Sequence, residues 1–156
     1  MNDIHNIYKL LNWKNNDEMR AEGFRLAKEI EDLSLLILPP ASPSVWECCA
    51  QVLYEKSDVV LEPYLDGLLE WLQDLNWPGA MIICDRLTII SGEKLLPSFI
   101  SAFNHAIDSN DKEGLMWFDY LSELLDNEDL KIRLPNDIVN KLQEHYHNWG
   151  FWYEGD

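Results

Sequence analysis

The sequence is short of basic residues, and this shortage narrows the choice of partners. Its 156 residues include 28 acidic but only 12 basic side chains, which gives a formal net charge of −16. Nucleic acids and anionic membrane surfaces are bound mainly through clusters of Lys and Arg. We therefore expect neither nucleic acid nor a membrane to be a partner of this protein.

Long apolar runs and a leader pattern are also lacking. The longest apolar stretches, such as Leu35–Leu38 and Gly79–Cys84, fall far short of the about 20 residues that a transmembrane helix needs. The segment Met1–His5 has neither the basic nor the apolar region of a secretion signal. With only three cysteines, two of them adjacent, a disulfide framework is not indicated. The sequence thus predicts a cytoplasmic protein with buried, reduced thiols.

The motifs of common catalytic and metal sites do not occur. No H-E-x-x-H, G-x-S-x-G, P-loop or G-x-G-x-x-G pattern is present. Cys48 and Cys49 would point about 100° apart on a helix, and His145 and His147 would face nearly opposite ways, so neither pair suits one metal ion. His105 is interpreted as an ordinary helix residue. We predict no catalytic residue, no cofactor and no metal, hence a protein that is not an enzyme.

Helical periodicity dominates the chain, and no alternating pattern of a β-strand persists. The spacing predicts a first helix over Ile4–Leu11 and a second over Asp17–Leu36, with Met19 on its inner face. The second helix is expected to end before Pro39 and Pro40. Later helices are expected to begin at Ser42-Pro43, at Asn76-Trp77-Pro78 and near Asp111.

A repeat connects these helices. Pro43 and Pro78 are 35 residues apart, and intervening helices are expected to open at Pro63, Pro97 and Pro135, because proline fits a first helical turn. Two helices in about 35 to 40 residues are typical of HEAT repeats. We predict a single all-α domain over residues 1–156, with seven to eight helices stacked as antiparallel hairpins in a HEAT-like α-solenoid.

The segment from His145 to Asp156 is rich in aromatic side chains. We interpret it as a cap over the apolar face of the last hairpin, and the alternative is an exposed docking segment. Its aromatic residues are Tyr146, Trp149, Phe151, Trp152 and Tyr153.

Between Lys56 and Arg86 the chain has no basic residue, and four acids there share one face of a predicted helix. We call these four the acidic stripe: Glu62, Asp66, Glu70 and Asp74. Like charges at four-residue spacing cost about 0.2–0.5 kcal/mol per pair, so a basic partner would relieve repulsion. The stripe is thus either a docking surface for a basic partner or the solvated face of an acidic protein. Trp71 and Trp77 flank its end, as core residues or as interface anchors.

The run Leu68–Ala80, LLEWLQDLNWPGA, resembles the signature of a family of small bacterial proteins known only as a domain of unknown function. The core pattern of that family is W-L-Q-D-x-N-W-P, and Leu61-Glu62-Pro63 and Leu95-Leu96-Pro97 also fit it. The resemblance covers about residues 58–125. It implies a helical, HEAT-like fold and brings no established catalytic residues.

Small acidic bacterial proteins of this kind also resemble the immunity proteins of toxin systems. With the acidic stripe, this resemblance suggests a non-enzymatic protein-binding module, most specifically a cytoplasmic immunity protein that neutralises a basic toxin domain. In this hypothesis the stripe steers the partner, and Trp71 or Trp77 anchors it. The alternatives are a small helical enzyme with a site between hairpins and a general HEAT-like scaffold. The oligomeric state is not predicted.

Overall fold

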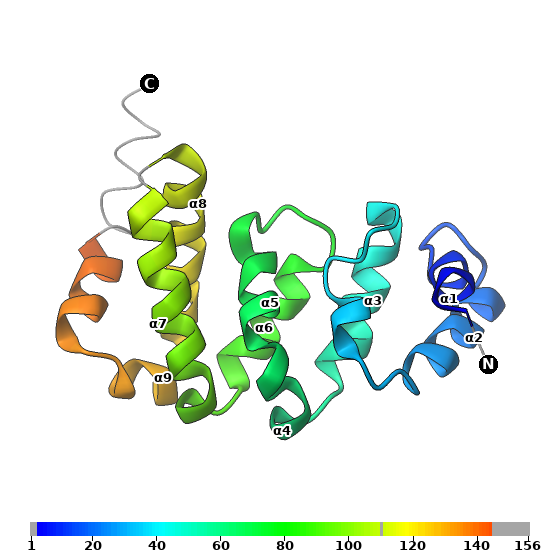
Figure 1. Cartoon of the computed structure of the whole chain (residues 1–156), viewed down its shortest axis with the longest axis horizontal. Coiled ribbons are helices and arrows are strands. Elements are labelled where there is room, and N and C mark those ends of the chain that lie inside the picture. Colours follow the sequence, from blue (N-terminus) through cyan, green and yellow to red (C-terminus); the bar gives the residue numbers. More distant parts are fainter. Residues whose placement is uncertain (1–2, 110, 145–156) are drawn as a thin grey trace.

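The structure is a computed structural model of the chain, and it describes residues 3–109 and 111–144. Within these residues all regular structure is helical and no strand occurs, which confirms the predicted all-α class. The helices follow one another along the long axis of the molecule (Figure 1). The HEAT-like arrangement stays a prediction, and the aromatic segment 145–156 lies outside the described residues.

The N-terminal layer consists of α1 (Ile4–Leu10) and α2 (Asp17–Ala27). The predicted extension of the second helix to Leu36 is wrong, because residues Leu33–Leu36 form a separate 3-10 helix, η1. The carboxylate of Asp32 accepts a hydrogen bond from the amide of Ser34 and so caps this new turn. Met19 is 41% exposed rather than on an inner face.

The middle layers begin as predicted at Ser42 and Pro43. A 3-10 turn, η2 (Pro43–Val45), leads into α3 (Trp46–Tyr54). The chain then runs through α4 (Asp58–Leu61), η3 (Glu62–Tyr64), α5 (Leu65–Glu70) and η4 (Trp71–Gln73). This helical run starts at Asp58 and not at Pro63, because the hydroxyl of Ser57 caps it by accepting from the amide of Val60.

The C-terminal layers contain α6 (Ala80–Ile89), α7 (Gly92–Ser109), α8 (Lys112–Leu121), η5 (Ser122–Asp126) and α9 (Glu128–Arg133). A further helical run covers 136–144. The predicted starts at Asp111 and Pro135 are confirmed, since Asp111 caps α8 and Pro135 precedes the last run. Pro97 instead lies inside α7, which begins at Gly92. The described residues thus form nine α-helices, α1 to α9, besides the run 136–144. Seven to eight were predicted, and the number is higher because several predicted helices are divided.

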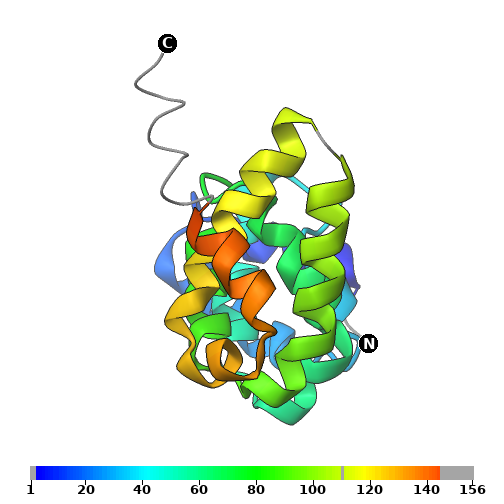
Figure 2. The same cartoon turned by 90° about the vertical axis from the view of Figure 1, so that its left-hand side faces the viewer.

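Each helix packs mainly on its neighbours in the stack. The packed pairs include α1 with α2, α3 with α6, α5 with α7, and α7 with both α8 and α9. Figure 2 views the end of the stack at which α7, α8, α9 and the run 136–144 lie together. The layer of α1 and α2 lies at the opposite end (Figure 1).

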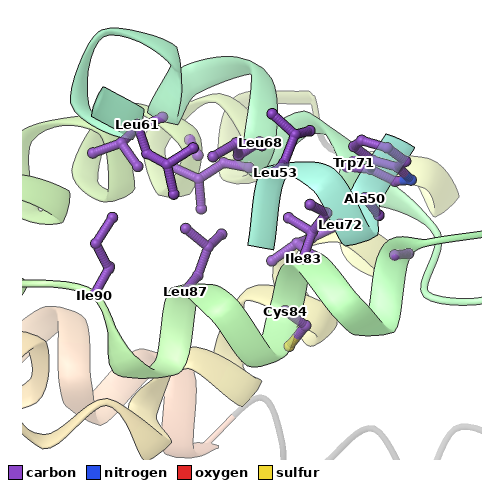
Figure 3. Packing of buried hydrophobic residues seen from close by; sticks show 14 of the residues in the cluster. Ala50, Leu53, Leu61, Leu68, Trp71, Leu72, Ile83, Cys84, Leu87 and Ile90 are labelled. Carbon is purple, nitrogen blue, oxygen red and sulfur yellow. The ribbon is translucent and has the colours of Figure 1, made fainter. Parts of the chain in front are cut away.

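One continuous cluster of buried apolar side chains extends from Ile7 to Leu142. In its centre, side chains of α6 meet those of α3 and η4 (Figure 3). Cys48, Cys49 and Cys84 are buried in this cluster as free thiols, as predicted. Burial raises the pKa of both Cys49 and Cys84 to about 12, so neither forms a thiolate near neutral pH.

Candidate functional site

A groove of about 390 Å³ lies between α5, α7 and the first turn of α8. Its described lining contains four acidic residues and no Lys or Arg. Asp66 and Glu70 come from α5, whereas Asp111 and Glu113 come from the start of α8. We call this the acidic groove. The rest of its lining is Gln73, Ser98, Ser101, Ala102, His105, Ser109, Gly114 and Trp117.

A tryptophan holds the two walls of the acidic groove together. The indole N–H of Trp117 in α8 donates to the carbonyl oxygen of Leu69 in α5 over 3.0 Å, although 48 residues separate them. The ring of His105 in α7 stands edge-on to the indole, with 5.8 Å between the ring centroids. Three helices therefore meet at this buried indole, which fixes the distance between the acids of α5 and those of α8.

The turn between α7 and α8 positions the second pair of acids. The carboxylate of Asp111 accepts a hydrogen bond of 2.7 Å from the amide of Gly114 and so caps α8. A Cβ atom on Gly114 would lie 2.7 Å from the carbonyl oxygen of Ala106 and 2.8 Å from the Cβ of Ser109. Glycine at this position lets α8 start close against α7, which brings Asp111 and Glu113 to the rim of the groove.

The acidic stripe is not one continuous helix face. Asp66 and Glu70 reach the acidic groove, but Glu62 forms an ion pair with Lys94 at 2.9 Å. Asp74 has left the helix, with φ −147° and ψ 107°, and its carboxylate accepts from the amide of Asn76 at 2.8 Å. The structure thus brings together two of the four predicted residues. It adds Asp111, which the sequence had indicated only as a helix start, and Glu113, which the sequence had not singled out.

The two predicted tryptophan anchors differ in their exposure. Trp71 has 0% of its surface exposed, and its indole N–H donates to the carbonyl of Pro78 at 3.0 Å. The prediction of Trp71 as a partner contact is therefore corrected: it is a core residue. Trp77 is half-buried, and its ring stands edge-on to that of Trp46 at 6.0 Å. Of the two, only Trp77 keeps surface that a partner could contact.

The segment LLEWLQDLNWPGA forms a tight junction between η4 and α6. Gly79 has a left-handed backbone with φ 83°, and a Cβ atom there would lie 2.8 Å from the Cβ of Ala50 and 2.9 Å from the Trp71 ring. The predicted helix start at Asn76-Trp77-Pro78 is wrong: α6 begins only at Ala80, and the backbone N–H of Asn76 donates to the carboxylate of Asp74 in the preceding turn. The motif thus has a structural role, to which glycine and the buried indole contribute directly.

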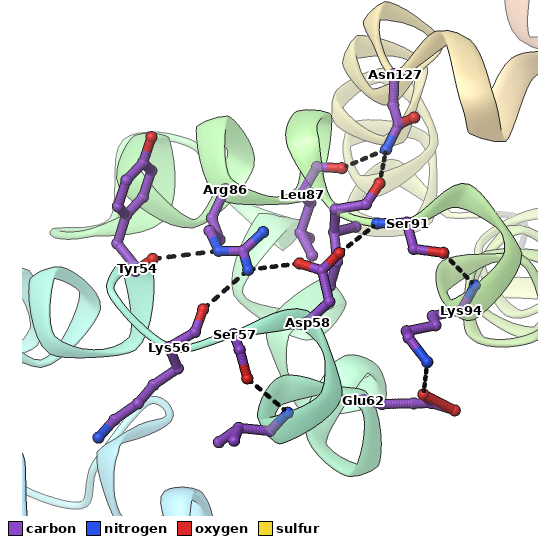
Figure 4. Close-up of polar contacts among 12 residues, drawn as sticks. Tyr54, Lys56, Ser57, Asp58, Glu62, Arg86, Leu87, Ser91, Lys94 and Asn127 are labelled. Atoms are coloured by element: carbon purple, nitrogen blue, oxygen red, sulfur yellow. Dashed lines mark hydrogen bonds and ion pairs between the residues drawn. The ribbon is translucent and has the colours of Figure 1, made fainter.

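A buried polar network is centred on Arg86 of α6. The guanidinium of Arg86, 6% exposed, donates to the carboxylate of Asp58 at 2.6 Å and to the carbonyls of Tyr54 and Lys56 (Figure 4). Asp58 also accepts from the amide of Ser91 at 3.0 Å. Burial by itself would raise the pKa of Asp58, but the hydrogen bonds from Arg86 and Ser91 outweigh it and the pKa is lowered. The network joins α4 and α6 to Ser91, the residue before α7.

A second polar contact fixes α9 to the end of α6. The side-chain amide of Asn127 donates to the carbonyls of Leu87 and Ile90 at 2.8 and 2.9 Å (Figure 4). Its oxygen accepts from the amide of Leu130 at 3.0 Å. Asn127 is buried, and the three bonds satisfy both ends of its amide group.

The described residues lack three other kinds of arrangement. No group of three or more His, Cys, Asp or Glu lies close enough there to hold a metal ion. No helix in this part of the chain combines the length and apolarity needed to cross a bilayer. The only ring contact of His105 found there is with Trp117, and no hydrogen bond joins its imidazole to a serine or a carboxylate. The prediction that the chain is not an enzyme stays a prediction.

Comparisons with known proteins give one match. The model of a family described as a domain of unknown function (DUF5071) matches residues 47–145, a wider range than the resemblance seen in the sequence. No curated protein and no solved structure matches the chain.

Proposed function

Because the chain belongs to the DUF5071 family, whose function is unknown, we propose a function from its surface: a protein-binding module that binds a basic partner. The observation that carries this proposal is the acidic groove. Four carboxylates from two elements surround a hollow that no Lys or Arg of the described residues lines. A Lys or Arg side chain of a partner fits the charge of this groove.

Repulsion among these acids supports binding rather than a structural role. Asp66 and Glu70 are four residues apart on α5, and such a pair costs about 0.2–0.5 kcal/mol. Neither has an ion-pair partner within the described chain, in contrast to Glu62, which pairs with Lys94. A positive side chain placed between α5 and α8 would relieve this repulsion. The same field would accelerate the approach of a basic partner.

The most specific form of the proposal is an immunity protein that neutralises a basic toxin domain in the cytoplasm. The acidic groove would receive basic side chains of the toxin, and Trp77 would anchor the edge of the contact. Glu62 and Asp74 would contribute only to the long-range field, because both already have contacts within the chain. The free buried thiols support a reducing compartment.

The test is a comparison of two charge-reversed proteins. Asp66→Lys with Glu70→Lys alters the groove, and Glu29→Lys with Asp85→Lys makes the same change in net charge at exposed acids elsewhere. An Arg-rich peptide added to the wild type should shift the NMR signals of backbone amides around the acidic groove. We expect these shifts to be lost in the first protein alone. The immunity proposal requires a toxin domain encoded beside the gene of this protein, and we expect the first protein alone to fail in protecting cells that produce that domain. If both proteins bind and protect as the wild type does, the groove is only a solvated surface.

A further inference from the structure

Residues 3–36 lie at one end of the stack, opposite the end that α8 and α9 occupy (Figure 1). We call α1, α2 and η1 together the N-terminal unit. Contacts within it are close: the hydroxyl of Tyr8 in α1 donates to the carbonyl of Leu35 in η1 at 2.6 Å. Gly23 lets α2 approach α1, because a Cβ atom there would lie 2.9 Å from the side chain of Leu11. The family match begins at residue 47, so the whole unit precedes the part that the family shares.

The side-chain polar contacts that join the N-terminal unit to later helices lie at the surface. The ammonium of Lys56 donates to the carbonyl of Lys28 at 3.0 Å in an exposed position. The hydroxyl of Tyr64 donates to the carbonyl of Glu31 at 3.4 Å, also in an exposed position. The ion pair between Lys28 and Glu55 spans 3.4 Å, and more than half of each side chain is exposed. Such contacts contribute little to stability, because water competes for both partners.

Buried polar groups join the later helices to one another. Arg86 links α6 to α4 and to the chain after α3, Asn127 links α9 to the end of α6, and the indole of Trp117 links α8 to α5. If one of these helices separated from the others, a buried polar group would lose its partner, which is costly. The later helices are therefore expected to open together, whereas the N-terminal unit is held to them by apolar packing and exposed contacts.

The connection between the N-terminal unit and the later helices has the features of a hinge. Leu38 has a left-handed backbone with φ 43°, which costs free energy for a residue other than glycine. The next residue, Pro39, is held to α3, because its carbonyl accepts from the indole N–H of Trp46 at 3.0 Å. Strained backbone therefore lies directly between the unit and the first residue that is fixed to α3. One backbone bond crosses the hinge, from the amide of Trp13 to the carbonyl of Ser44 at 3.1 Å.

We infer that the N-terminal unit opens about Leu38 as one piece, while the stack from α3 to the run 136–144 stays folded. The unit is thus a cap that uncovers one side of α3 when it opens. The acidic groove lies between α5, α7 and α8, away from this joint. The inference therefore does not depend on the proposed function.

Cys48 and Cys49 in α3 lie on the side that the N-terminal unit covers. Burial raises the pKa of Cys48, and the positive charge of Arg20 in α2 opposes this rise. The pKa of Tyr8 in α1 is raised by burial and then by the charge of Cys49. Both thiols are thus within electrostatic reach of the unit, and opening of the unit exposes them to reagents.

Cys84 in α6 serves as the probe of the later helices. Its thiol is buried, and its pKa is raised by burial and then by Glu123 of η5, so it faces η5 and not the N-terminal unit. When only the unit opens, Cys84 stays buried.

The test is the rate at which iodoacetamide modifies each cysteine of the full-length protein at pH 8, followed by mass spectrometry. The urea concentration is kept below the unfolding transition of every protein compared. At low reagent concentration, the rate follows the population of the form in which the thiol is exposed. In the wild type we expect Cys48 and Cys49 to react at least about tenfold faster than Cys84.

Two matched variants distinguish the two openings. Ala21→Gly weakens α2 and Ala102→Gly weakens α7, each at a position inside its helix. Ala21→Gly should accelerate the modification of all three thiols about fivefold, because the unit is open in each reactive form. Ala102→Gly should accelerate Cys84 by about the same factor and leave Cys48 and Cys49 at the wild-type rate.

Three results would overturn the inference. The first is one common rate for the three thiols of the wild type, which would mean that the stack opens as a whole. The second is acceleration of Cys48 and Cys49 in Ala102→Gly to the same extent as Cys84, which would mean that α7 opens together with the unit. The third is faster modification of Cys84 than of Cys48 and Cys49, which would place the weaker joint at the other end of the stack.

Discussion

The guanidinium of Arg86 and the carboxylate of Asp58 lie 2.6 Å apart although 28 residues separate them along the chain. Arg86 has almost no exposed surface, so its charge is compensated by Asp58 and by two backbone carbonyls. Through Asp58 the same network reaches the amide of Ser91, just before α7. The buried guanidinium of Arg86 in α6 thus binds both the chain that follows α3 and Asp58 of α4.

We expect Asp58→Ala to lower the free energy of unfolding by about 3 kcal/mol, because it leaves Arg86 buried without its counter-ion. The control is Asp17→Ala, which removes an ion pair with Arg20 whose carboxylate is almost fully exposed. That change should cost less than about 1 kcal/mol. Urea unfolding followed by circular dichroism measures both values. Equal losses would show that the buried network contributes no more than a surface pair.

The same pair predicts a pH dependence. The pKa of Asp58 is lowered in the folded chain relative to an unfolded value of about 3.9, so folding favours the ionised form. Its contribution is complete above about pH 4 and is lost as the pH falls through the folded pKa. We expect Asp58→Asn to show a smaller loss of stability than the wild type below about pH 4. Parallel curves in urea titrations over this range would contradict the assignment.

Gly79→Ala should destabilise the junction between η4 and α6 by about 2 kcal/mol or more. The substitution places a Cβ atom on a left-handed backbone and against Ala50 and Trp71. The control is Gly67→Ala in α5, where the nearest atom, of Ile37, lies 3.3 Å from the new Cβ. That protein should change by less than about 1 kcal/mol, since alanine favours the helix. Thermal unfolding would show the difference, and similar melting temperatures would rule it out.

The three cysteines should be inert in the folded protein. With burial raising the pKa of Cys49 and Cys84 to about 12, and that of Cys48 upward, hardly any thiolate is present at pH 8. We expect no reaction with a thiol reagent such as DTNB in buffer and three equivalents in 6 M guanidinium. Rapid modification of one thiol in buffer would mean that the layer of α3 opens readily.

Local signals in the sequence correctly predicted the all-α class and several helix boundaries. Asp111 caps α8, and Pro135 precedes the run 136–144, because both act on the residues that follow them directly. Pro63 and Pro97 misled the prediction, since each lies inside a helical run that begins at an earlier residue. For α7 that start depends on a distant contact, in which Asp129 accepts from the amide of Gly92 at 2.6 Å. A pattern of prolines does not contain this information.

In the acidic groove, too, local spacing predicted some residues correctly and distant contacts decided the others. Spacing of four residues placed Asp66 and Glu70 on one face of a helix, and the structure confirms that both line the groove. Asp111 and Glu113 join them only because Trp117 ties α8 to Leu69, a contact between residues far apart in the chain. Glu62 leaves the set for an equally distant reason, its ion pair with Lys94. Tertiary packing therefore decides which acids share a surface.

The hydrogen-bonded indoles have an optical consequence. Trp46, Trp71 and Trp117 each donate to a backbone carbonyl, and these bonds join the chain before α3, the junction at α6 and the wall between α5 and α8. The indoles of Trp71 and Trp117 are buried, so their fluorescence lies at shorter wavelength than that of an indole in water, whereas Trp46 is half-buried. The molecule thus carries native fluorophores at three separate joints. In variants that keep only one of these tryptophans, the emission wavelength during unfolding would report the order in which these three contacts are lost.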